Sequence, residues 1–157
     1  MPSLTPRFET APAFLLAGTR QIHSFADAPR DIPSQWQAFA PQLPLPGQKG
    51  TRTFGATCAA WPDEQRFEYM CAAEVESFDN LPEGMGRMRV PEAHYAVFTH
   101  EGPISKIRET WEAVFAWFTA SGQIPANTPD FELYDQLNDR EAKPGIVEIW
   151  FPIRKPD

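Results

Sequence analysis

The chain has 157 residues, 42% of them hydrophobic and 22% charged, and its formal net charge at pH 7 is -7. This length and composition predict one globular domain, 1–157, with a real core, and the acidic excess without a basic cluster argues against direct nucleic-acid binding. No apolar run approaches the ~20 residues of a membrane-spanning helix, and the first residues lack the pattern of a secretion signal, so we expect a cytoplasmic protein without membrane contact.

The first half of the chain predicts a strand, a helix and two further strands. These four segments are APAFLLAGTRQIHSF (11–25), DIPSQWQAFAPQL (31–43), TRTFGATCAAW (51–61) and RFEYMCAAEV (66–75). Cys58 and Cys71 lie on either side of the turn between the last two strands, nearly opposite each other in a hairpin. We expect them to be two small buried thiols, because disulfides are uncommon in a reducing compartment.

The second half repeats the same order of elements. Its segments are EAHYAVFTHEG (92–102), ISKIRETWEAVFAWFTASG (104–122), PDFELYDQ (129–136) and GIVEIWFPI (145–153). Trp36 and Trp117 match at an offset of 81 residues, and TFGAT at 53–57 matches DFELY at 130–134 at an offset of 77. We therefore predict pseudo-repeats at about 8–78 and 89–154, joined by a crossover at 76–94 and sharing one sheet.

The helix of the second half has the clearest pattern. Apolar residues recur along it at spacings of three and four, which gives a stripe that packs on the sheet: Ile104, Ile107, Trp111, Val114, Phe115 and Phe118. Gly122 suits its C-terminal end. Trp111 and Trp117 point from different sides of this stripe, so one of them can border a groove while the other is buried.

The last two predicted strands carry acids among aromatic residues. Side chains alternate along a strand, so Glu132 and Tyr134 share one face, and Glu148 and Trp150 share one face of the next strand. If the strands pair in an even register around a turn near 140–141, all four side chains lie on a common face. The sequence therefore predicts two carboxylates beside two aromatic rings.

A charged carboxylate surrounded by aromatic rings destabilises the fold unless it is paired with a cation or hydrogen-bonded, or becomes protonated. A flat apolar cation satisfies it, because the acid supplies the opposite charge and each ring adds about 0.5–2 kcal/mol of cation-π attraction. The structural alternative is that Glu132 accepts hydrogen bonds from Tyr134 or from backbone amides and ties the hairpin together. The 12 Phe, 5 Trp and 3 Tyr of the chain favour a ring-lined core or cavity.

Four motifs in order resemble the gyrase-inhibitor-like family, the effector-binding domains also found behind the DNA-binding modules of AraC- and MerR-type regulators. They are YAVFTHEGP (95–103), the helix ending TWEAVFAWFTASG (110–122), FELY (131–134) and VEIWFPI (147–153). The resemblance implies an α+β fold of duplicated strand-helix-strand-strand units on an antiparallel sheet. It also implies that the two main helices lie on one face, with a groove between the halves for hydrophobic, often cationic small molecules.

The resemblance assigns the family's acid to Glu132 and the aromatic that follows it to Tyr134. It assigns further positions to Tyr95, Glu148 and Trp150, and the helix stripe adds Trp111 as a ligand contact. We expect no metal, because His23, His94 and His100 are scattered through the sequence, and no cofactor.

Two other functions stay open. In a small-molecule hydrolase, Glu132 or Glu148 would activate a water while Tyr134 or Tyr95 donates a proton to the substrate. In a protein-interaction module, the acidic surface would mimic or block another macromolecule.

Overall fold

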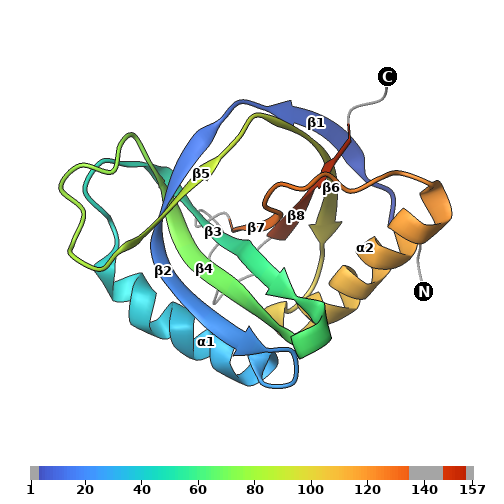
Figure 1. The fold of residues 1–157 in the computed structure, drawn as a ribbon, viewed down its shortest axis with the longest axis horizontal. Coiled ribbons are helices and arrows are strands. Elements are labelled where there is room, and N and C mark those ends of the chain that lie inside the picture. Colours follow the sequence, from blue (N-terminus) through green and yellow to red (C-terminus); the bar gives the residue numbers. More distant parts are fainter. Residues whose placement is uncertain (1–3, 135–146, 155–157) are drawn as a thin grey trace.

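The computed structural model describes residues 4–134 and 147–154 as an α+β fold, with one eight-stranded antiparallel sheet and two α-helices. The strands are β1 (Arg7–Ala11), β2 (Phe14–Ser24), β3 (Gln48–Trp61), β4 (Arg66–Val75), β5 (Gly86–Val90), β6 (Ala93–His100), β7 (Phe131–Tyr134) and β8 (Val147–Ile153). The helices are α1 (Ala28–Phe39) and α2 (Ile107–Ser121), with short 3₁₀ turns at Ala40–Gln42, Pro62–Glu64 and Ile104–Lys106. The sheet curls, and both helices lie on the outside of the curl (Figure 1).

The sheet order confirms the predicted duplication. From one edge to the other the strands run β1-β6-β8-β7-β3-β4-β2-β5. The units β2-α1-β3-β4 and β6-α2-β7-β8 therefore place their strands in the same order outward from the central β3 and β7. These two strands pair antiparallel, with Gly55 directly opposite Glu132. The two residues that match at an offset of 77 are thus cross-strand neighbours at the centre of the sheet.

Two edge strands were not predicted. β1 pairs with β6 and β5 pairs with β2, so each directly precedes one unit in sequence but extends the sheet of the other unit. β5 lies inside the segment 76–94 that the sequence predicted as a crossover. Both strands have five residues and a mostly exposed or half-exposed pattern, so they lack the sustained alternation that identifies a buried strand.

The first helix is displaced from its predicted position. It begins at Ala28 and ends at Phe39, whereas the sequence predicted 31–43. Pro29 fits its first turn, where no intrahelical N–H bond is lost. Pro41 has no backbone N–H for the next helical hydrogen bond, so the α-helix ends before it and the chain continues as a 3₁₀ turn.

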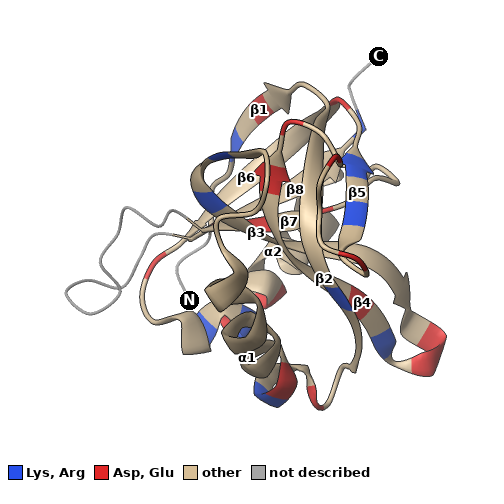
Figure 2. Cartoon of the chain, turned by 90° about the vertical axis from the view of Figure 1, so that its left-hand side faces the viewer, with Lys and Arg blue, Asp and Glu red and all other residues tan. Residues whose placement is uncertain are grey.

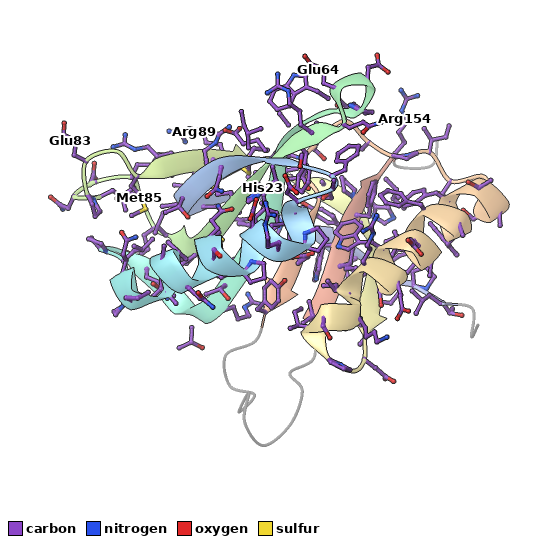
Figure 3. All side chains as sticks on the ribbon, turned by 90° about the horizontal axis from the view of Figure 1, so that it is seen from below. His23, Glu64, Glu83, Met85, Arg89 and Arg154 are labelled. Carbon is purple, nitrogen blue, oxygen red and sulfur yellow. The ribbon has the colours of Figure 1, made fainter. Side chains whose placement is uncertain are left out.

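The core divides between the two faces of the sheet. Inside the curl, side chains of both halves pack together, among them Leu16, Phe54, Met70, Tyr95, Phe131 and Leu133. On the outer face, Phe39 of α1 packs against β2 and β4, while Val114 and Phe118 of α2 pack against β6 and β8. Gln35 also holds α1 to the sheet, since it bonds to the buried His23 ring at 2.7 Å (Figure 3).

Both cysteines are free. They do not face each other as predicted, because Cys71 lies opposite Gly55 and the register of the β3–β4 pair shifts between Thr57 and Ala59. Neither α-helix of the described ranges is long and apolar enough to cross a membrane. On the side shown in Figure 2, acidic and basic residues are interspersed, and β5 carries Arg87 and Arg89.

Candidate functional site

The predicted common face of the last hairpin is wrong. β7 and β8 pair with Phe131 opposite Trp150, Glu132 opposite Ile149 and Leu133 opposite Glu148. Residues directly opposite each other share a face, so Glu132 and Tyr134 lie on the helix-bearing side, while Glu148 and Trp150 lie on the inner side of the curl. The register differs by one residue from the predicted one, which is enough to move a strand's side chains to the other face. The predicted turn near 140–141 lies outside the described residues.

Aromatic packing inside the curl favours the observed register. The Phe131 ring stacks on Trp150 at a centroid distance of 5.7 Å and an interplanar angle of 14°, and Tyr95 packs edge-on against both. The even register would have turned Trp150 away from Phe131 and Leu133. Apolar packing of Phe131 on Trp150 therefore favours this register, and the register places Glu132 and Glu148 on opposite faces of the sheet.

Glu132 lies on the outer face between the two units, with 8% of its surface exposed. Three donors reach its carboxylate. Oε1 accepts hydrogen bonds from the Tyr69 hydroxyl at 2.8 Å and the Tyr134 hydroxyl at 2.6 Å. Oε2 accepts one from Trp111 Nε1 at 2.8 Å. The predicted neighbours Tyr134 and Trp111 are thus in contact with Glu132, and Tyr69 is an additional one.

The first helix reaches the same carboxylate through Tyr69. Trp36 Nε1 of α1 donates to the Tyr69 hydroxyl at 3.1 Å, and the Trp36 ring packs edge-on against Tyr134 at 5.3 Å. Both helices therefore present an indole at this position, Trp36 from α1 and Trp111 from α2. Figure 3 shows the central strands lying between the two helices.

Sequence reasoning missed Trp36 and Tyr69. Trp36 was matched to Trp117, but Trp117 packs against Phe8, Phe98 and Phe118 and does not contact Glu132. Tyr69 is 63 residues from Glu132 in sequence, and no local pattern joins such distant positions. The one available signal was the match of Gly55 to Glu132. In the structure, the strand of Gly55, β3, lies between β7 with Glu132 and β4 with Tyr69.

Gly55 provides the space for this arrangement. A Cβ at position 55 would overlap the Tyr69 hydroxyl and lie 2.8 Å from Glu132 Oε1. Position 55 is the counterpart of Glu132 in the other unit, and the two lie side by side. The centre of the sheet therefore has room for one acidic side chain, which explains why the first unit has glycine where the second has glutamate.

The donors around Glu132 remain protonated at neutral pH. Burial, and then the charge of Glu132, raise the pKa of both the Tyr69 and the Tyr134 phenol well above the ordinary value of 10.0. Each hydroxyl therefore keeps its proton and donates a hydrogen bond to the carboxylate. Among the ion pairs of the described ranges, none includes Glu132. The hydrogen bonds to this carboxylate in the described ranges therefore all come from neutral donors.

The other predicted contacts lie inside the curl. Glu148 forms an ion pair with Arg7 at 2.8 Å and accepts a hydrogen bond from Trp150 Nε1 at 3.1 Å. The charge of Glu148 is therefore already compensated by Arg7 of β1. Tyr95 is fully buried, and its hydroxyl has no hydrogen-bond partner in the part of the chain that the structure describes.

A second acid, Asp130, lies two positions before Glu132 and directly precedes β7. Asp130 Oδ1 accepts a hydrogen bond from Thr57 Oγ1 at 2.8 Å. Desolvation, partly offset by this hydrogen bond, and the nearby charge of Glu132 raise the pKa of Asp130 from 3.8 to about 7. The carboxyl borders a cavity of about 220 Å³, lined by 57–60 of β3 and 127–130. Within the described ranges no group of three His, Cys, Asp or Glu is placed to hold a metal ion.

The chain belongs to the GyrI-like family. The family model described as a GyrI-like small molecule binding domain matches residues 4–154. This confirms the resemblance that the sequence motifs carried, and the α+β fold agrees with it.

The chain is similar in sequence to a transcriptional regulator and in fold to several solved structures. The Transcriptional regulator BrlR of Pseudomonas aeruginosa is 34% identical over 151 residues, which are 94% of this chain and 54% of BrlR, so the chain spans about half of that relative. The structure of SAV2435 bound to tetraphenylphosphonium superposes with a TM-score of 0.78 at 18% identity, covering 96% of this chain and 94% of the other. The EcmrR C-terminal domain gives 0.70 at 18% identity, covering 98% and 99%.

Proposed function

We propose that this chain binds hydrophobic cations at Glu132, between α1 and α2. The observation that carries the proposal is a buried carboxylate held by Tyr69, Tyr134 and Trp111, with no cationic side chain among the described residues paired to it. The same hydrogen bonds are also expected under the structural alternative, in which Glu132 only holds neighbouring elements together. The aromatic surroundings and the family favour the ligand.

The chemistry of the cluster suits a bulky apolar cation. Neutral O–H and N–H donors stabilise a carboxylate without cancelling its charge, so a cation brought beside it still gains Coulomb energy. The indoles of Trp36 and Trp111 offer ring faces, each worth about 0.5–2 kcal/mol toward a cation. The complex of the similar SAV2435 fold with tetraphenylphosphonium supports this ligand class.

Tetraphenylphosphonium binding to Glu132→Gln tests the proposal. We expect tryptophan fluorescence to respond saturably with the natural chain, because Trp36 and Trp111 lie at the site. Removing the charge while keeping the side-chain shape should weaken binding about tenfold or more, which corresponds to about 1.4 kcal/mol. The neutral triphenylphosphine oxide should bind with similar affinity to both forms.

Glu148→Gln is the matched control. It removes one negative charge from the neighbouring strand, but on the face where Arg7 already compensates it, so the affinity should change less than about twofold. Equal losses in the two variants would mean that net charge, not the Glu132 site, attracts the cation. An unchanged affinity in Glu132→Gln would reject the proposal.

A further inference from the structure

We propose that the preferred ligands are dications, with one cationic centre at Glu132 and a second, smaller one at Asp130 in the adjoining cavity. This inference rests on the proposed function and adds a second subsite to it. Asp130 directly precedes β7 and lies two positions before Glu132, so in this extended stretch their carboxyl groups are expected to lie about 7 Å apart. A ligand that satisfies both acids therefore carries two positive centres at about that separation.

The two acids share the outer face of the sheet. Thr57 lies opposite Tyr69 on β4, and Tyr69 reaches Glu132 on that face. Thr57 Oγ1 also donates to Asp130, which places the Asp130 carboxyl on the same side. The Glu132 cluster and the cavity are consequently neighbours along one surface, and a single ligand can span them without crossing the sheet.

The cavity provides hydrogen-bond acceptors as well as space. Its volume of about 220 Å³ equals that of roughly seven waters in the liquid. Asp130 Oδ1 accepts a hydrogen bond from Thr57 Oγ1, and the Asp130 carboxyl lies on the cavity wall. Thr128 Oγ1, on the same cavity wall, is buried without a partner among them. An ammonium group carries three donors, which suits these oxygens.

No protein cation is paired with Asp130 in the described ranges. The titratable groups that face Asp130 are Glu132 of β7 and Cys58 of β3. Burial raises the pKa of Cys58 to about 11, so this thiol is neutral. Arg20 and Glu68 are the other charged groups that act on Cys58, and they form an ion pair with each other at 2.6 Å.

The protonation of Asp130 should follow ligand charge. With a pKa near 7 it is about half protonated at neutral pH. A cationic group in the cavity favours the carboxylate, so binding of a dication releases the Asp130 proton to solvent. By linkage, dication affinity should rise as the pH increases toward about 7–8 and then level off.

The bland explanation is that Asp130 only closes the end of the β3–β7 pair. Thr57 N donates to the Asp130 backbone oxygen at 3.1 Å, and the side-chain bond continues that contact. A purely structural role affects stability, but it does not distinguish one ligand charge from another. The decisive readout is therefore the ratio of two affinities.

Two triphenylphosphonium compounds provide this ratio. Butyltriphenylphosphonium has one positive centre, and 4-aminobutyltriphenylphosphonium adds an ammonium at the end of the same chain. We expect the amino compound to bind at least about tenfold more tightly at pH 8, a gain of about 1.4 kcal/mol. The gain should shrink at pH 6, where Asp130 is mostly protonated.

Asp130→Asn should abolish the gain and its pH dependence, while the affinity for butyltriphenylphosphonium stays within about twofold. Asparagine keeps the acceptor for Thr57, so the variant is expected to fold. Glu132→Gln should weaken both compounds. The inference is overturned if the amino compound binds no better than the butyl compound, or if the gain survives in Asp130→Asn. Failure of both compounds to bind would instead reject the proposed function, and the inference with it.

Discussion

At the scale of single residues, the Glu132 side chain has its space because Gly55, opposite it, has no side chain. They are counterparts in the two units and direct neighbours across β3 and β7. A side chain at 55 would occupy the place of the Tyr69 hydroxyl and crowd the Glu132 carboxylate. An approximate twofold arrangement can therefore carry one central acid only when the opposite position has no side chain. Glycine is required here for space.

Gly55→Ala should lower the free energy of unfolding by about 1–3 kcal/mol, the usual cost of overpacking a buried site. The variant must also displace Tyr69 from Glu132, so cation affinity should fall with stability. Urea unfolding measures the first effect and tryptophan fluorescence the second. In a Tyr69→Phe background the hydroxyl is absent, and the cost of Gly55→Ala should be smaller. An equal cost in both backgrounds would show that the Tyr69 contact is not the cause.

At the scale of elements, α2 ends as its sequence predicted. Gly122 caps the helix with a φ of 75°, in the left-handed region that glycine enters without strain. The amphipathic stripe was also correct in outline, since Val114 and Phe118 are buried and Ile107 packs with them. Ile104 and Phe115 are exceptions, because they are 52% and 54% exposed, and Phe115 stacks on Trp111 beside the Glu132 cluster. The helix itself begins after a 3₁₀ turn.

Gly122→Ala should destabilise the protein by about 1 kcal/mol, because alanine pays a steric penalty at positive φ. Gly122→Asn should cost less, since asparagine tolerates this conformation better. Thermal or urea unfolding of the two variants checks the order. Cation binding should be unaffected in both, as Gly122 lies at the far end of α2 from Trp111. A larger loss in the asparagine variant would contradict this account of the helix end.

At the scale of the whole molecule, the two edge strands of the curled sheet, β1 and β5, lie outside the repeated units. β1 extends the sheet of the second unit and β5 that of the first (Figure 1). Side chains of both units then share the core inside the curl. Each unit therefore needs the other to bury its apolar side chains, and Glu132 lies where the two units meet.

Asp130 should make the stability of the whole protein depend on pH. Its pKa is raised from 3.8 to about 7 in the folded state, so between about pH 4 and 7 the folded protein holds a proton that the unfolded chain has lost. Stability from this group therefore decreases as the pH rises through that window and is constant above it. Asp130→Asn removes the effect, and its unfolding free energy relative to the natural chain should increase by about 1–3 kcal/mol from pH 5 to pH 8. Urea unfolding at both pH values measures this, and a difference that is constant or reversed in sign would contradict it.

The sequence by itself determined the order of the units, the helix stripe in outline and the family. These depend on neighbours a few residues apart, on repetition and on motifs, all of which are visible along the chain. Tertiary structure decided that Glu148 and Trp150 lie apart from Glu132, and that Tyr69 and Trp36 join it. Strand register and cross-sheet contacts depend on how residues far apart in sequence pack, and a shift of one position reverses the faces of a strand. Local patterns specify such a shift too weakly, so the membership of the site could be settled only by the packed sheet.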